Sequence, residues 1–186
     1  MALPQSRQDQ LITGEELSRM PDLGPCELVA GRIIPMPPTR YTHGELEVDL
    51  GAALQAYARE TGRGRVMGGE VGIYIRRDPD TVRGADLFFI SHERYARRGS
   101  AAYLDVPPEL VVEILSPTDR WSDVRDKLGD YLAAGVDIVL IVDPRRKEVL
   151  AYRSMTEIQR FSESDTLTAE EILPGFALPV SALFRD

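Results

Sequence analysis

The sequence predicts an α/β (α+β) fold in which helices flank a mixed β-sheet core. Apolar, β-branched runs recur along the chain, and such runs are typical of strands buried in a sheet. A segment with helical spacing connects two of the most apolar runs, residues 109–116 and 138–142. Predicted strands outnumber predicted helices, so we expect the sheet to form the core and the helices to cover it.

Length and composition indicate one folded domain. The chain has 186 residues, of which 43% are hydrophobic and 28% are charged, and this balance is typical of globular proteins. We expect a flexible N-terminal tail over residues 1–12 and a single domain over residues 13–186. The one cysteine, Cys26, excludes an internal disulfide and a Cys-rich zinc site.

The charge and hydropathy patterns argue against a membrane-spanning protein, a secreted protein and a module that coats nucleic acid. No apolar stretch approaches the roughly 20 residues that span a bilayer, and the N-terminus lacks a secretory signal. We therefore expect a cytoplasmic protein without membrane contact. The net charge of -8 argues against a module that coats nucleic acid, because neutralising phosphates requires an excess of Lys and Arg. An enzyme that approaches DNA through one basic face or bound metal ions remains compatible with that charge.

The N-terminal part of the domain predicts a helix and a hairpin. A short helix is expected over residues 13–20, because Thr13 and Glu16 have the spacing of a capping box. Residues 27–29 and 32–34 predict two short strands separated by a two-residue turn that contains glycine.

A longer helix and two strands follow. The helix is expected over about residues 42–60, and an apolar stripe recurs along it at helical spacing. The stripe consists of Leu46, Leu50, Leu54 and Tyr57. Residues 70–76 and 86–90 predict strands on either side of the turn-rich sequence RDPDTVRG. Residues 91–108 predict a long connection.

The remaining predicted elements alternate between strand and helix. After the strand over residues 109–116, a helix is expected over residues 122–134, and Gly135 would end it. Residues 138–142 and 147–153 predict two further strands. We expect the segment that follows to pack against the domain.

Two carboxylates in apolar strands are the first candidates for chemistry. Glu113 lies within the apolar run ELVVEILSP, and Asp86 begins the apolar run DLFFI. A buried carboxylate loses several kcal/mol on desolvation unless a cation or a donor compensates it. Together with the main-chain carbonyl of Ile114, the pair could hold Mg²⁺ or Mn²⁺, which prefer oxygen ligands. The alternative is that each acid only ends a strand, and the sequence leaves the two interpretations about even.

Lys127 favours the first interpretation. It lies within the core-facing stripe of the helix over residues 122–134, between Val124 and Tyr131. A lysine at such a position either snorkels to the rim of the helix or pairs with an acid. If the helix crosses back over the sheet, the ammonium would approach Glu113. There it could orient a nucleophilic water or stabilise charge in a phosphoryl transition state.

Two further residues and one segment have open roles. Glu27 could add a carboxylate to the metal site or be a solvated strand residue. His43, near the start of the long helix, could be a general base, a DNA contact or a helix residue with a local hydrogen bond. The connection over residues 91–108 contains several Arg and Tyr residues that could contact phosphates, although a solvated basic loop is the favoured interpretation.

The order of several sequence blocks resembles a known family. The blocks are ELVAGRIIPM, HGELEVDL, ADLFFIS, PPELVVEILSPTDRWSDVRDKLGDYLAAGV, LIVDP and LPGFALPVSALF. They resemble the Uma-type family of endonucleases, a domain of unknown function within the PD-(D/E)XK, or restriction endonuclease-like, superfamily. The resemblance extends from about Thr13 to Phe184, and the block around Glu113 and Lys127 is its most specific part.

This resemblance implies a restriction endonuclease-like fold and magnesium-dependent cleavage of DNA. Asp86 and Glu113 match the acids of the superfamily motif, whereas Leu115 stands where its lysine normally follows. In this family the lysine has moved to the next helix, at Lys127. The early glutamate and histidine of the family match Glu27 and His43.

Two departures from the family pattern concern backbone shape and packing. Ala85 replaces the proline that usually precedes the first Asp, and Val139-Leu140 replace an aromatic pair before the final IVD. All three catalytic residue types remain. We therefore expect a metal-dependent endonuclease that acts on DNA as a homodimer. The competing hypothesis is a nuclease-like DNA- or protein-binding regulatory protein with little turnover. A third is hydrolysis of another phosphodiester.

Overall fold

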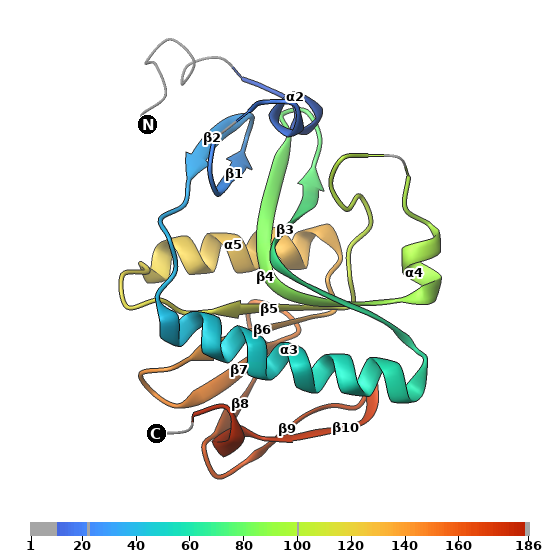
Figure 1. Ribbon diagram of the computed structural model, residues 1–186, viewed down its shortest axis with the longest axis vertical. Coiled ribbons are helices and arrows are strands. Elements are labelled where there is room, and N and C mark those ends of the chain that lie inside the picture. The colour runs from blue at the N-terminus through green and yellow to red at the C-terminus, as the bar shows by residue number, and fades with distance from the viewer. Residues whose placement is uncertain (1–10, 22, 100, 185–186) are drawn as a thin grey trace.

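A large mixed β-sheet forms the middle of the molecule in the computed structural model (Figure 1). The structure describes residues 11–21, 23–99 and 101–184. The sheet has the strand order β2-β1-β4-β5-β6-β7-β8, and β3 also pairs with β4. Its strands are β1 (Cys26–Val29), β2 (Arg32–Pro35), β3 (Gly64–Arg76), β4 (Thr81–Ser91), β5 (Leu110–Ile114), β6 (Ile138–Asp143), β7 (Glu148–Tyr152) and β8 (Ile158–Ser162). The predicted mixed sheet flanked by helices is confirmed.

Two helices cover opposite faces of the sheet. The stripe of α3 (Tyr41–Thr61) packs with Leu87 and Phe89 of β4. On the other face, α5 (Trp121–Ala134) packs with Phe88 and Ile90. Because successive side chains of a strand point to opposite faces, the run LFFI supplies both cores. The long apolar runs of the sequence are therefore buried on both sides.

The N-terminal elements lie at one end of the sheet, where β2 and β1 are its first two strands. The capping box of α2 (Gly14–Ser18) is present, with Thr13 and Glu16 each accepting a backbone N–H of the other. The hairpin of β1 and β2 is also confirmed, and Leu28 of β1 pairs with Val82 of β4. Of the expected tail, residues 1–10 lie outside the described residues. Ile12 donates its N–H to the Gly31 carbonyl.

Strands β3 and β4 form a long hairpin that is interrupted by a bulge. The pairing register shifts between Gly68 and Val71 of β3. The two bulged residues, Gly69 and Glu70, have positive φ angles of 87° and 58°, a conformation that is rare for a side chain other than glycine. Both strands are longer than expected, and Asp86 lies inside β4 rather than at its start.

A parallel β-α-β unit follows. Strands β5 and β6 pair in parallel, with Glu113 opposite Ile141, and α5 connects them. Helix α5 ends at Gly135, whose φ of 100° closes the helix in the left-handed conformation. The strand expected over residues 147–153 is β7, and β8 pairs with it in antiparallel fashion.

Several elements were not predicted. A short helix, α4 (His92–Ala96), begins the region expected to be a connection. Near the C-terminus, β9 (Thr166–Ala169) and β10 (Leu173–Pro179) form a separate two-stranded sheet, and the 3₁₀ turn η1 (Val180–Ala182) follows it. Their apolar side chains join the core beneath α3, as expected for a packed terminal segment. None of the helices described here is both long and apolar enough to cross a membrane.

Candidate functional site

The site lies where β4 and β5 stop pairing. Their last paired residues at this end are Leu87 and Val112, so Asp86 and Glu113 are the next residues on the two strands. The Ile114 N–H donates to Asp86 Oδ2 at 2.6 Å, in place of a strand ladder bond. Since the N–H and C=O of a strand residue share one edge, the Ile114 carbonyl also points toward this gap.

Lys127 reaches the site from α5. Its Nζ lies 2.7 Å from Glu113 Oε2 and 3.2 Å from Glu27 Oε1. The side chains of Lys127 and Glu113 are only 15% and 13% exposed, so Lys127 does not snorkel to the rim. The inward position inferred from helical spacing brings the ammonium between two carboxylates.

Glu27 is buried, which excludes the solvated alternative. Its Oε1 accepts the Gly84 N–H at 3.0 Å, and its Oε2 accepts a hydrogen bond from Arg83 at 2.8 Å. Arg83 in turn binds Asp130 of α5 at 2.7 Å. With Lys127, these contacts occupy both oxygens of Glu27 and connect β1 and β4 to α5.

Tyr131 fixes the other side of Glu113. Its hydroxyl lies 2.8 Å from Glu113 Oε1 and 3.2 Å from the Gly84 carbonyl. One turn of α5 therefore supplies two donors to the same carboxylate, because Lys127 and Tyr131 are four residues apart and share a helix face.

His43 connects α3 to the first acid. Its Nε2 lies 3.2 Å from Asp86 Oδ2, and the histidine is buried. The hydrogen bond to Asp86 raises the pKa of His43 above its ordinary value, against the effect of burial. This contact is long-range in sequence, whereas the sequence suggested a local hydrogen bond as one alternative. Its Nδ1 is buried and has no hydrogen-bond partner.

Glu70 is a site residue that the sequence reasoning missed. The bulge in β3 turns its carboxyl toward Asp86 and Gly84, and a Cβ atom on Gly84 would lie 3.0 Å from Glu70 Oε2. That oxygen is buried without a hydrogen-bond partner. Burial, with repulsion from Asp86 next, raises the pKa of Glu70 to about 7. The available signal was an acid directly after two glycines inside a strand pattern, because such glycines often mark a bulge.

The electrostatics of the site favour a cation. Burial raises the pKa of Glu113 to about 8, although Lys127 opposes this rise. Burial alone would lower the pKa of Lys127, but Glu113 and Glu27 raise it above its ordinary value. Two permanent cations therefore face a larger set of acids. The cations are Arg83 and Lys127, and the acids are Glu27, Glu70, Asp86, Glu113 and Asp130.

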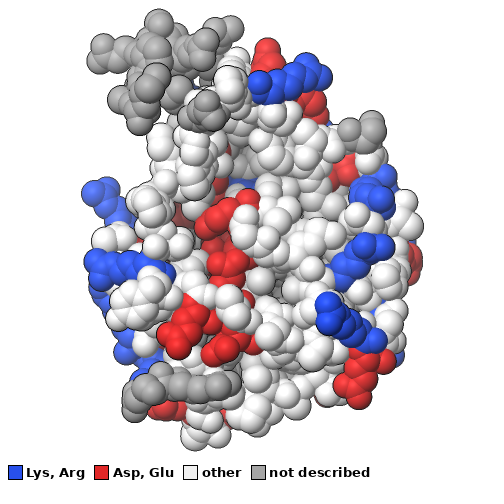
Figure 2. Space-filling view, viewed as in Figure 1, with Lys and Arg blue, Asp and Glu red and all other residues white. Residues whose placement is uncertain are grey.

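The charge distribution at the surface agrees with this excess. Figure 2 shows acidic side chains gathered down the middle of one face, with Lys and Arg toward its margins. Within the described part of the chain, no three His, Cys, Asp or Glu side chains already have the spacing of a metal centre. The fit to a metal ion therefore rests on the oxygen donors, on the unpartnered Glu70 oxygen and on the excess of acidic over basic side chains.

A family model matches almost the entire domain. The match covers residues 15–181, and the model is that of Uma2, described as "Putative restriction endonuclease". The chain belongs to the Uma2 family. The resemblance drawn from the sequence blocks is thereby confirmed. No curated protein matches this Uma2 chain.

A solved structure shares the fold. It is the crystal structure of "a putative nuclease belonging to DUF820" from Anabaena variabilis, with a TM-score of 0.79 and 20% sequence identity. The match covers 93% of the Uma2 chain and 97% of the other protein. At this identity the likeness establishes the fold, and family membership connects the chain to nucleases.

In the basic connection between β4 and β5, Arg94 has a structural role. Arg94 binds Glu109 and Asp137 and also donates to the carbonyls of Pro107 and Pro108. These contacts fix α4 against the start of β5. Arg97 pairs with Glu93 on the exposed surface of the Uma2 protein.

Proposed function

We propose that the protein is a metal-dependent endonuclease that hydrolyses DNA phosphodiester bonds in the gap between β4 and β5. The observation that supports this most strongly is the pairing of Glu113 with Lys127 at 2.7 Å, directly beside Asp86. An acid, a second acid and a lysine at one break in a sheet provide oxygen ligands and a fixed positive charge. Phosphoryl transfer requires both.

Mg²⁺ or Mn²⁺ fits the residues of this gap. Asp86, Glu113, Glu70 and the Ile114 carbonyl offer the hard oxygen ligands that these ions prefer. The buried Glu70 Oε2 without a partner is the kind of atom that a cation would satisfy. When bound, the ion would supply an activated water and offset charge on the phosphoryl oxygens.

Lys127 acts as a permanent donor rather than a base. Because Glu113 and Glu27 raise its pKa, it keeps its proton at neutral pH. An ammonium in a buried position can orient the attacking water and stabilise the negative charge that develops on the phosphate. It cannot accept the proton of that water.

Glu27 and Arg83 are proposed to position Lys127. Both oxygens of Glu27 are already engaged by Lys127, Arg83 and a backbone N–H. Such a carboxylate has little capacity left for a metal ion but holds the ammonium in place. By the same logic, His43 orients Asp86 through its contact with Oδ2.

DNA as the substrate and a homodimer as the assembly are both proposals. Membership of the Uma2 family supports a nuclease and thus a nucleic-acid substrate. The net charge of -8 favours the competing hypothesis of a nuclease-like regulatory protein with little turnover. The two hypotheses differ in whether DNA is cut once it is bound.

A cleavage assay tests the proposal. Labelled single-stranded and duplex DNA would be incubated with the protein and Mg²⁺ or Mn²⁺, next to Glu113→Gln and Lys127→Met variants. Each substitution is expected to reduce cleavage by on the order of 10²-fold or more. Lys147→Met is the matched control, because Lys147 pairs with Glu163 in the turn region after β6.

Thermal melting of each variant would separate loss of chemistry from loss of folding. Cleavage that persists in both folded variants would remove the assigned site. Binding of DNA by the wild-type protein without any cleavage would support the regulatory alternative instead.

A further inference from the structure

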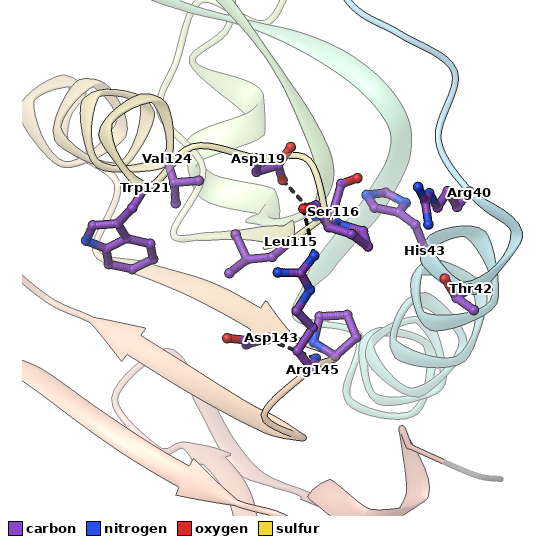
Figure 3. A pocket seen from close by; sticks show the side chains of 12 residues that line it. Arg40, Thr42, His43, Leu115, Ser116, Asp119, Trp121, Val124, Asp143 and Arg145 are labelled. Atoms are coloured by element: carbon purple, nitrogen blue, oxygen red, sulfur yellow. Dashed lines mark hydrogen bonds between the residues drawn. The ribbon is translucent and has the colours of Figure 1, made fainter.

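A cavity of about 140 Å³ lies next to the proposed catalytic gap (Figure 3). Its wall combines the first turns of α3 and α5, the loop after β5 and the turn after β6. His43 belongs to both places, because it lines the cavity and contacts Asp86 at 3.2 Å. A molecule in the cavity would therefore be one side chain away from the proposed metal ligands.

Trp121 forms one side of this cavity. It is the single tryptophan of the chain and remains 52% exposed. In Figure 3 its ring lies on one side, Arg40, Thr42 and His43 lie on the other, and Arg145 lies between them. An exposed indole face beside polar groups is the usual platform on which an unpaired nucleobase stacks.

Two helix N-termini face the same cavity. Both α3 and α5 begin after an arginine, Arg40 and Arg120, and neither helix has a side-chain hydrogen bond at its N-cap. Helix N-termini attract anions through free N–H groups and the helix dipole. The independent observation is His43, which is only 6% exposed, lines the cavity and has an Nδ1 without a partner.

The acids in the wall are already engaged. Asp119 accepts the Ser116 N–H at 2.7 Å, and Asp143 accepts the N–H groups of Arg145 and Arg146. These bonds direct their charge into local turns and reduce their repulsion of a phosphate. With Arg40 and Arg145 present, the wall offers donors and acceptors around an aromatic face.

We propose that this cavity binds one unpaired nucleotide of a DNA strand, with the base on Trp121 and the phosphate at Arg40 and the N-terminus of α3. The inference deepens the proposed nuclease function and rests on it for the identity of the strand. A cavity of about 140 Å³ accommodates one base but not a base pair. A base stacked within a duplex also has no free face for the indole. The preferred substrate is therefore single-stranded DNA or an unpaired junction.

Fluorescence of the single tryptophan provides a direct test. In EDTA, which prevents metal-dependent cleavage, oligothymidylate is expected to quench Trp121 saturably, and a blunt duplex of equal length is expected to bind at least ten-fold more weakly. Inorganic phosphate alone should compete with the oligonucleotide without quenching Trp121. Arg40→Ala is expected to weaken oligonucleotide binding roughly ten-fold, since it removes a charge-assisted phosphate contact. Arg59→Ala, in the last turn of the same helix, is the matched control and should bind as the wild type does.

Variants of Trp121 lack the fluorophore of the first assay, so their binding is measured by the anisotropy of labelled oligothymidylate. Trp121→Leu is expected to lose roughly ten-fold in affinity, and Trp121→Phe is expected to retain most of it because stacking is preserved. Equal quenching by the duplex, or equal binding by Arg40→Ala and Arg59→Ala, would overturn the inference.

This result is separable from the proposed chemistry. Glu113→Gln should bind oligothymidylate like the wild type while losing cleavage. Binding with all of these dependences but without cleavage by the wild type would support the nucleotide site and contradict the nuclease. Cleavage by the wild type without these binding dependences would support the nuclease and contradict the nucleotide site.

Discussion

Replacing Glu70 by glutamine should make the metal-free protein more stable while removing its response to metal. The Glu70 carboxyl has its pKa raised to about 7 from an ordinary value of 4.5, first by burial and then by Asp86. At about 1.36 kcal/mol per pKa unit, keeping this group ionised in the folded protein costs roughly 3 kcal/mol above pH 8. Solvent screening of a partly exposed carboxyl reduces this to about 1–2 kcal/mol. The glutamine side chain of Glu70→Gln would have the same shape and backbone strain without the charge.

The sign of the pH dependence follows from the raised pKa. In the wild type, the stability contributed by this group is fully present below pH 4.5 and is lost as the pH rises through about 7. Urea unfolding in EDTA should therefore show Glu70→Gln and wild type alike at pH 4.5, with the variant more stable at pH 8.

Glu45→Gln, which changes a surface acid of α3, is the control and should leave stability unchanged. With Mn²⁺ added, the melting temperature of the wild type should rise and that of Glu70→Gln should not. A variant that is less stable than wild type in EDTA at pH 8, or that keeps the full Mn²⁺ response, would refute this placement of Glu70.

Three further changes test how the site is held together. Lys127→Met should destabilise the protein by about 3–5 kcal/mol in urea unfolding, because it leaves buried carboxylates without their cation. The double variant Lys127→Met/Glu113→Gln should recover part of this stability. Tyr131→Phe should cost about 1–2 kcal/mol through the lost hydrogen bond to Glu113, and equal midpoints in urea would contradict that contact. Arg83→Met should lower the free energy of unfolding by about 3 kcal/mol, because Glu27 would lose one of its cationic partners. It should also slow DNA cleavage, because Glu27 holds Lys127 in place. Cleavage at the wild-type rate would show that Glu27 does not position the lysine.

Part of the site could be predicted because its signals are local. Glu113 stood out as a charge inside an apolar run, and Lys127 stood out as a charge inside the apolar stripe of a helix. Both patterns record burial directly in the sequence. A parallel β-α-β unit then brings strand and helix together, and their contact at 2.7 Å agrees with the pattern.

Other features depend on the path of the chain in three dimensions. The contact of His43 with Asp86 requires the start of α3 to lie against the middle of β4, which no local spacing encodes. Glu70 reaches the site only because a bulge changes the direction of its side chain, and the strand pattern before the bulge is weakened by glycines. Strands β8 and β10 have little alternation, and β9 has only four residues, so their pairing partners decide their conformation.

The most direct measurement is anomalous scattering from crystals soaked in Mn²⁺. The predicted result is a manganese peak in the gap between β4 and β5, in contact with carboxylate oxygens of Asp86 and Glu70, and its absence from Asp86→Asn crystals. A gap without manganese at saturating concentration, or a peak that persists unchanged in Asp86→Asn, would contradict the metal site and with it the proposed mechanism.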